Sequence, residues 1–177
     1  VLIDELGWPV SSSVVTAMIT QSELGREPGA TIVVNTLTSR MVHELVERLG
    51  GRVVVSRVGH TFVKAAMIEH DAIFGGEHSA HYYFRDFWYA DTGMVPALMA
   101  LATLGREGRP LSEVVASFGE YPASGEINSV VSDASAVLDR IASSFAGRGD
   151  IDRLDGITVS AADWRLNVRP SNSEPLV

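Results

Sequence analysis

The 177-residue sequence contains no cysteine, which excludes disulfide bonds, thiolate catalysis and cysteine-based zinc sites within it. It is also poor in basic charge, because 14 lysine and arginine residues stand against 22 acidic ones, for a formal net charge of −8. Lys64 is the single lysine, and the arginines are scattered. Nucleic acids and anionic membranes require clustered cationic side chains. The composition therefore predicts no nucleic acid and no membrane among its main partners.

Long hydrophobic runs are missing as well. No apolar segment approaches the roughly 20 residues that a membrane-spanning helix needs, and no signal-peptide pattern opens the chain. Hydrophobic residues still make up 46% of the sequence, enough for a buried core. We expect a soluble, cytoplasmic protein. Because the chain begins without methionine and ends on Leu176-Val177, which resembles the start of a strand, we also expect a fragment of a longer protein.

Short apolar segments alternate with helical patterns over residues 1–104. Residues 31–34, 53–55 and 72–74 predict buried strands. Helices are predicted after the serines at 11–13, after Thr36 or Thr38, over 61–70 and over 94–104. Apolar strands separated by helices are typical of a sheet covered on both faces. The prediction is an α/β domain with a mixed, mostly parallel sheet.

A change of composition follows at residues 105–110, a polar and turn-rich stretch that predicts a linker. Beyond it we expect a short helix over 111–118, a strand over 126–131, a second helix over 135–145 and a strand pair at 157–159 and 164–168. Residues 111–177 then form a truncated α+β domain. Its sheet lacks a strand after Leu176, so we expect residues 164–177 to be poorly ordered or to pair with another chain.

The densest polar segment is residues 75–86, Gly-Gly-Glu-His-Ser-Ala-His-Tyr-Tyr-Phe-Arg-Asp. It follows a predicted buried strand, where α/β sheets place ligand loops. Glu77 and Ser79 together suit sugar hydroxyls, because a carboxylate accepts from two neighbouring O–H groups and a serine adds a third partner. His78 and His81 titrate near neutrality and can move protons. From these residues alone, a surface loop with incidental polarity stays open as the alternative.

A metal site is a further interpretation of this part of the sequence. The potential ligands are His60, Glu77, His78, His81 and Asp86. Their spacing matches none of the usual zinc arrangements, and no HExxH motif is present. We therefore predict no metal held by this chain.

Residues 169–173, Arg-Pro-Ser-Asn-Ser, offer a guanidinium group, two hydroxyls, an amide and backbone N–H groups, which suit a phosphate dianion. Segments of this composition are commonly ordinary turns, so a turn is the competing interpretation. A second candidate for an anion is Gly59-His60-Thr61, at a predicted strand-to-helix junction. A lone histidine there is also typical of a cap or a packing residue.

Taken together, three segments resemble the phosphomannomutase/phosphoglucomutase (α-D-phosphohexomutase) family. They are Val58-Gly59-His60-Thr61, residues 75–81 and residues 169–175, in this order and at these approximate distances. The run Tyr83-Phe84-Arg85-Asp86 resembles the bacterial phosphomannomutase branch in particular. Members of the family have four domains around a central cleft. Residues 1–104 thus resemble the third domain and residues 111–177 a truncated fourth.

The resemblance implies a role for each matching residue. Glu77 and Ser79 would read the sugar hydroxyls, and Gly59 and His60 would contact the sugar or its phosphate. His81 matches a family histidine proposed for acid/base catalysis, and a positioning role for it is equally open. The side chains that would hold the non-reacting phosphate are those of Arg169, Ser171, Asn172 and Ser173. Residues 35–39 are uncharged, whereas some relatives carry a basic residue at this point.

The implied activity is the interconversion of mannose 6-phosphate and mannose 1-phosphate, through a phosphoserine enzyme and a hexose 1,6-bisphosphate that also serves as activator. Mg²⁺ and the phosphoserine would belong to the parent enzyme outside this chain. The expected partners are the hexose phosphate and the remaining parent domains, and we expect the chain alone to be inactive.

Other activities stay open. A phosphoglucomutase or a dual-specificity phosphohexomutase is the nearest alternative, since the two sugars differ only at C2. A glucosamine mutase fits less well, because His78 stands where that branch usually has glutamine. A non-catalytic sugar-phosphate-binding protein is the alternative from another class.

Overall fold

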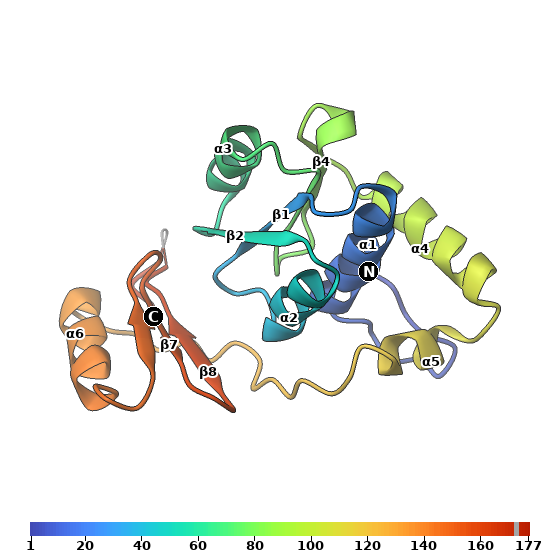
Figure 1. The fold of residues 1–177 in the computed structure, drawn as a ribbon. Coiled ribbons are helices and arrows are strands. Elements are labelled where there is room, and N and C mark those ends of the chain that lie inside the picture. Colours follow the sequence, from blue (N-terminus) through green and yellow to red (C-terminus); the bar gives the residue numbers. More distant parts are fainter. Residues whose placement is uncertain (172–173) are drawn as a thin grey trace. The chain divides into compact units, whose positions relative to one another are not determined.

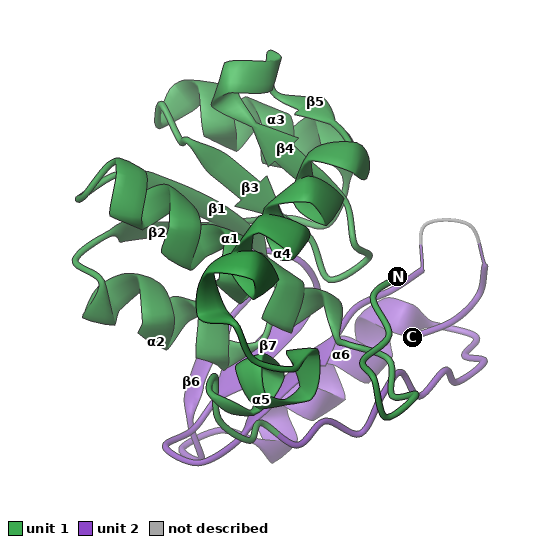
Figure 2. Cartoon of the chain, turned by 90° about the vertical axis from the view of Figure 1, so that its right-hand side faces the viewer, with its two compact units in different colours: residues 1–121 green, residues 122–177 purple. Residues whose placement is uncertain are grey.

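The computed structural model describes residues 1–171 and 174–177 of the chain. These residues divide into two compact units, Val1–Tyr121 and Pro122–Val177 (Figure 2). Each unit contains its own sheet. Figure 1 shows the order of the helices and strands along the chain.

The boundary between the units lies beyond the linker that the sequence predicts at residues 105–110. The short helix α5 (Leu111–Ala116) follows that stretch, and its side chains Leu111 and Val114 are buried in the core of the first unit. Phe118 packs against the same core. The first unit, expected from the sequence to end at residue 104, therefore extends to Tyr121, because these apolar side chains complete its core.

The first unit is built on a five-stranded sheet with the order β2-β1-β3-β4-β5. Its strands are β1 (Thr31–Asn35), β2 (Arg52–Ser56), β3 (Phe74–Gly76), β4 (Tyr82–Phe84) and β5 (Ala90–Asp91), with a short 3-10 helix, η1 (Arg85–Phe87), between the last two. β1 pairs in parallel with β2 and β3, whereas β3–β4 and β4–β5 are antiparallel. The predicted α/β fold with a mixed sheet is confirmed, and β4 lies in the segment that the sequence indicated as a polar loop.

Helices cover both faces of this sheet (Figure 1). The core on one face is formed with α1 (Ser12–Arg26), α2 (Arg40–Arg48), α4 (Met94–Glu107) and α5, and the smaller core on the other with α3 (His60–Glu69). Ile32 and Val34 point into the first core, and Val33 into the second. β1 is buried at every position, which explains its apolar run. Across the part of the chain that the structure describes, no helix is long and apolar enough to span a bilayer.

The starts of α1 and α2 depend on serine caps. Ser11 caps α1, as predicted, and its hydroxyl accepts a hydrogen bond from Val14 N at 3.2 Å. Ser39 caps α2 and accepts from Met41 N at 3.3 Å, so the predicted caps Thr36 and Thr38 are wrong. Thr38 instead donates its hydroxyl to Asn35 Oδ1 at 3.1 Å. It thereby shapes the loop between β1 and α2.

Two glycines at the end of β3 let helices approach the sheet closely from both sides. A Cβ atom added to Gly76 would lie 2.8 Å from both Cγ2 and Oγ1 of Thr16 in α1. One added to Gly75 would lie 2.6 Å from Met67 Sδ in α3. The Gly75-Gly76 pair therefore sets the distance of α1 and α3 from the sheet at the point where the polar segment begins.

We expect Gly76→Ala to lower the free energy of unfolding of the first unit by about 1–3 kcal/mol, the usual cost of overpacking. Thr16 is β-branched and only 1% exposed, so it cannot turn away from the new methyl group. Gly75→Ala is the matched comparison and should cost less, because the closest atom, Met67 Sδ, belongs to a flexible side chain and the β-branched Val63 is farther away, with Cγ1 at 3.2 Å. Urea unfolding followed by circular dichroism measures both, and equal losses would contradict this explanation.

The second unit contains α6 (Ala134–Ser144) and an antiparallel sheet of β6 (Asp150–Asp152), β7 (Ile157–Ser160) and β8 (Arg165–Val168) in the order β6-β7-β8. The predicted second helix and strand pair are confirmed. The strand predicted over 126–131 is reduced to a bridge between Val130 and Leu176. Residues 164–177 were also expected to be poorly ordered or to pair with another chain, whereas the described residues of this segment pair within the chain. β8 pairs with β7, and Ser129 and Val177 exchange two backbone hydrogen bonds.

Candidate functional site

Three segments of the first unit meet at the carboxyl ends of the parallel strands. Asn35 is the last residue of β1, Glu77 follows β3 directly, and Gly59 lies just after β2. Asn35 Nδ2 donates to Glu77 Oε2 at 3.3 Å, and Gly59 N donates to the same oxygen at 3.1 Å. One carboxylate therefore ties together segments that are far apart in the sequence.

Glu77 also occupies the anion position that the sequence predicts at the start of α3. Gly59 is the N-cap of this helix, with a φ of 128° that favours glycine, and its N–H group points at the Glu77 carboxylate. A helix N-terminus attracts negative charge through its unpaired N–H groups. The anion bound at this helix start is thus a side chain of the same chain.

The loop between β1 and α2 orients the amide of Asn35. Its Oδ1 accepts from Leu37 N and from the Thr38 hydroxyl, both at 3.1 Å. The NH₂ group is therefore turned toward Glu77, and Asn35 is 1% exposed. Sequence reasoning missed this residue. The signal was an asparagine at the end of a buried strand, where its side chain can bond to the backbone two residues on.

Glu77 is 2% exposed, and among the described residues its carboxylate accepts hydrogen bonds from three, Asn35, Gly59 and Tyr83. A carboxylate offers about four lone-pair positions, so roughly one is left. Buried charge persists only when it is satisfied in this way. The reading of sugar hydroxyls by Glu77 stays a prediction, and the structure adds a second role as the anchor of the surrounding loops.

Tyr83 in β4 is fully buried on the α3 side of the sheet. Its hydroxyl donates to Glu77 Oε1 at 2.6 Å and lies 2.7 Å from His60 Nδ1. Burial, together with the Glu77 carboxylate, raises the pKa of the phenol far above its ordinary value. The sequence indicated Tyr83 as part of a family motif but did not place it in the site, because nothing local shows which face of a strand it occupies.

His60 and His81 lie against each other at the margin of this cluster. Their ring centroids are 4.4 Å apart with an interplanar angle of 64°. His81 Nδ1 lies 2.7 Å from Asp91 Oδ2, and Tyr82 N donates to Asp91 Oδ1 at 3.2 Å, which holds this carboxylate beside the ring. Asp91 was also missed in the sequence, since β5 brings it to His81 only through strand pairing.

The turn between β3 and β4 exposes His78 and Ser79. Glu77 N donates to His81 O at 3.0 Å, and Ala80 N donates to Glu77 O at 3.1 Å, which closes the turn. The Ser12 hydroxyl donates to the His78 carbonyl oxygen and ties the turn to α1. The structure thus brings together four of the predicted residues, Gly59, His60, Glu77 and His81, and Ser79 lies in the turn between Glu77 and His81.

Arg169 and Ser171 belong to the second unit and follow β8. Arg169 Nε lies 3.5 Å from Asp155 Oδ2, a loose ion pair with a carboxylate that is mostly buried. Ser171 N donates to Leu176 O at 2.9 Å, and the Ser171 hydroxyl accepts from Glu174 N at 3.3 Å. These bonds join Ser171 to Glu174 and to Leu176. Asn172 and Ser173, predicted for the same phosphate site, lie outside the described residues.

One group of side chains in the first unit has the composition of a partial metal site. His60, His81 and Asp91 each offer a ligand atom, and these atoms lie within 4.8 Å of one another. Two imidazoles and a carboxylate suit a transition metal, whereas Mg²⁺ prefers oxygen ligands. The group therefore does not fit the Mg²⁺ that the family resemblance implies. His81 and Asp91 already bond to each other.

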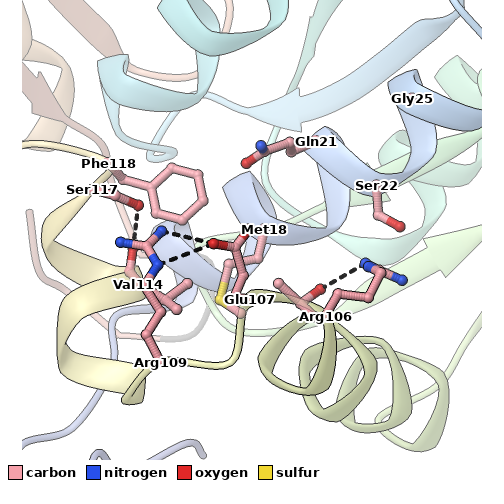
Figure 3. Close-up of a pocket in the computed structure, with 11 residues that line it drawn as sticks. Met18, Gln21, Ser22, Gly25, Arg106, Glu107, Arg109, Val114, Ser117 and Phe118 are labelled. Atoms are coloured by element: carbon pink, nitrogen blue, oxygen red, sulfur yellow. Dashed lines mark hydrogen bonds and ion pairs between the residues drawn. The ribbon is translucent and has the colours of Figure 1, made fainter.

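A cavity of about 390 Å³ lies between α1, α4 and α5, away from this cluster (Figure 3). Its two guanidinium groups are engaged, because Arg106 donates to Thr103 Oγ1 at 3.2 Å and Arg109 pairs with Glu107 at 2.9 Å. Among the described residues that line it, none is a predicted site residue. The cavity is therefore separate from the candidate site.

Comparison with known proteins shows which family this chain resembles. Residues 11–121 match the family described as phosphoglucomutase/phosphomannomutase, alpha/beta/alpha domain III, and this match ends where the first unit ends. The chain is 40% identical to a phosphomannomutase from Salmonella montevideo and 39% identical to one from Escherichia coli K12, over 99% of its length and 39% of theirs. It is 37% identical to "phosphohexose mutases" from Xanthomonas campestris, over 98% of its length and 39% of theirs.

A solved structure shows the same fold. It is an X-ray structure of a phosphoglucomutase/phosphomannomutase family protein from Burkholderia thailandensis, with a TM-score of 0.77 and 24% identity, and the match covers 96% of this chain and 37% of that one. The first unit is thus an α/β/α domain of the third-domain type. The chain belongs to the phosphoglucomutase/phosphomannomutase family, which confirms the resemblance drawn from the sequence. It spans about 39% of the length of the curated relatives that it matches.

Proposed function

We propose that this chain is the substrate-recognition part of a phosphomannomutase. The reaction is the interconversion of mannose 6-phosphate and mannose 1-phosphate, through a phosphoserine enzyme and a hexose 1,6-bisphosphate. Relatives called phosphomannomutase, 39–40% identical over 99% of the chain, support this choice of substrate. The observation that carries the proposal is the convergence of Gly59, His60, Glu77 and His81 on one edge of the first sheet, beside the turn that carries Ser79.

In this proposal the first unit recognises the sugar. Every sugar hydroxyl that leaves water needs a replacement hydrogen bond. The exposed Ser79 hydroxyl and the remaining acceptor position of Glu77 supply two partners at the turn, and the two histidine rings line the same margin. His81 is the candidate for proton transfer, because Asp91 holds its ring by one nitrogen and leaves the other for the substrate.

Arg169, Ser171, Asn172 and Ser173 of the second unit are assigned to the non-reacting phosphate. The ion pair between Arg169 and Asp155, at 3.5 Å, is longer than a strong hydrogen bond. The guanidinium group can therefore engage a dianion without losing a strong bond. A planar guanidinium fork is the side chain that best matches phosphate oxygens.

Phosphoryl transfer depends on positioning and on charge neutralisation by a metal ion. The phosphoserine and Mg²⁺ are assigned to parts of the parent enzyme outside this chain, with hexose 1,6-bisphosphate as activator. The isolated chain is therefore expected to bind hexose phosphate without turning it over. Measurable turnover by the purified chain would contradict this division of roles.

An NMR titration of the chain with mannose 6-phosphate tests the proposal directly. We expect amide shifts at Glu77, Ser79 and Arg169 with the sugar phosphate, and shifts near Arg169 alone with inorganic phosphate. Ser79→Ala should weaken the response to the sugar and leave the response to phosphate unchanged. A folded chain with sharp resonances that does not respond at millimolar mannose 6-phosphate would exclude recognition by this chain.

A dual mannose/glucose specificity is the second candidate. The relatives from Xanthomonas campestris, described as phosphohexose mutases and 37% identical, favour it. Mannose and glucose differ only in the configuration at C2, and both present hydroxyls that Glu77 and Ser79 can bond. Repeating the titration with glucose 6-phosphate ranks the two sugars. A similar affinity for both would favour the broader specificity.

A further inference from the structure

A single phenolic hydroxyl joins Glu77 to His60. The Tyr83 oxygen lies 2.6 Å from Glu77 Oε1 and 2.7 Å from His60 Nδ1, and both are hydrogen-bond distances. A phenol carries one proton, so it donates one of these bonds and accepts the other. Burial raises the pKa of Tyr83, and so does the Glu77 carboxylate, so the proton stays on the phenol at neutral pH.

The other neighbours of Glu77 decide the direction of these bonds. Asn35 Nδ2 and Gly59 N both donate to Oε2, so the carboxylate acts as an acceptor toward these neighbours. An ionised carboxylate can only accept hydrogen bonds. The Tyr83 proton therefore points to Glu77, and the phenol oxygen accepts from His60 Nδ1, which must carry a proton.

We propose that Tyr83 is a positioning residue that holds His60 in its Nδ1–H tautomer and thereby presents the His60 Nε2 lone pair at the sugar-binding edge. Histidine in water favours the other tautomer, and the hydrogen bond made by one ring nitrogen decides which form is present. Asp91 acts on His81 in the same way, because its carboxylate accepts from His81 Nδ1 at 2.7 Å. Both neighbouring rings therefore offer an acceptor at Nε2.

This assignment deepens the proposed function and rests on it. A neutral ring with an unprotonated Nε2 accepts hydrogen bonds at that atom and cannot donate one there. A sugar hydroxyl can donate such a bond, whereas a phosphate dianion can only accept. The sequence left two possible contacts for His60, the sugar or its phosphate. The Nδ1–H tautomer favours the sugar. The phosphate is assigned to Arg169 and the other phosphate-site residues of the second unit.

The tautomers are measured by long-range ¹H–¹⁵N NMR correlation of the imidazole nitrogens in the ligand-free 177-residue chain. We expect Nδ1–H for both His60 and His81. In Tyr83→Phe, His60 should revert to Nε2–H as its major neutral form, while His81 stays unchanged. Tyr82→Phe is the matched control, since the neighbouring Tyr82 faces the other core and its hydroxyl lies 3.4 Å from the Ser12 carbonyl oxygen.

Glu77→Gln provides a second variant of nearly the same shape. Its amide NH₂ would donate to the Tyr83 oxygen, so the phenol proton would turn to His60 Nδ1 and force His60 into the Nε2–H tautomer. A purely structural role for Tyr83 does not produce this reversal. The proposal is overturned if His60 of the unmodified chain is found in the Nε2–H form. It is also overturned if Tyr83→Phe folds and leaves the His60 signals unchanged.

Binding separates this proposal from the proposed function. Tyr83→Phe should weaken mannose 6-phosphate binding about fivefold to tenfold, the effect of one lost hydrogen bond, and leave binding of inorganic phosphate unchanged. Equal weakening of both ligands would contradict the assignment of His60 to the sugar. Failure of the unmodified chain to bind mannose 6-phosphate would count against the proposed function alone, because the tautomers are read without ligand.

Discussion

Replacement of Glu77 by alanine is expected to lower the free energy of unfolding of the first unit by about 3–5 kcal/mol, because each buried donor left without an acceptor costs about 1–3 kcal/mol. Three donors would lose their acceptor: Asn35 Nδ2, Gly59 N and the Tyr83 hydroxyl. Asn35 and Tyr83 are at most 1% exposed, so water cannot replace the carboxylate without opening the structure. Urea unfolding followed by circular dichroism measures the change.

Glu69→Ala is the matched control for Glu77→Ala. Glu69 is the last residue of α3 and is exposed, so its removal should change stability by no more than about 0.5 kcal/mol. If both variants lost the same small amount, Glu77 would not be the anchor of the three segments. The Glu77→Ala variant should also lose its response to mannose 6-phosphate at temperatures where it is still folded.

Replacement of Arg169 by lysine is expected to weaken the binding of inorganic phosphate and of mannose 6-phosphate at least tenfold, and replacement by alanine about tenfold to a hundredfold. Lysine keeps the charge but lacks the planar fork that matches phosphate oxygens. It also keeps a cation beside Asp155, which is 8% exposed, so the lysine variant isolates binding from folding. Titration calorimetry at fixed ionic strength gives both affinities.

Arg153→Ala serves as the control in the same unit. Arg153 pairs with Asp139 at 3.2 Å, and both side chains are more than half exposed, so its loss should affect neither stability nor phosphate binding. Equal weakening by the Arg153 and Arg169 variants would indicate a general effect of net charge on an acidic chain. Binding that is insensitive to Arg169 would remove this residue from the phosphate site.

The fold class of the first unit could be predicted from the sequence because each strand and helix leaves a local pattern. β1 is apolar because it is buried on both faces, and α2 shows helical spacing because one side faces the core. β4 was missed because three aromatic residues after a polar turn give too short a pattern. The true extent of the first unit was missed because Leu111 and Val114 join its core only after folding.

The candidate site could be predicted only where a motif marks it. Glu77, Ser79 and His81 lie in one short segment, and the segment around His60 matched the family as well. Asn35 and Asp91 were missed, since each reaches the site through strand pairing or a loop hydrogen bond formed far from the motif. The sequence also left the start of α3 open to an outside anion, whereas the structure fills it with Glu77.

The family, the α/β fold class and the chemical groups available for a sugar phosphate can be inferred from the residue types and their order along the chain. The folded structure is needed to show which of these groups already bond to one another. Asn35, Gly59 and Tyr83 donate hydrogen bonds to the Glu77 carboxylate. The Tyr83 hydroxyl also lies within hydrogen-bond distance of His60. The physical reason is that a hydrogen bond depends on atoms within about 3 Å of each other. Such proximity arises from strand pairing and packing, which no local pattern in the sequence records.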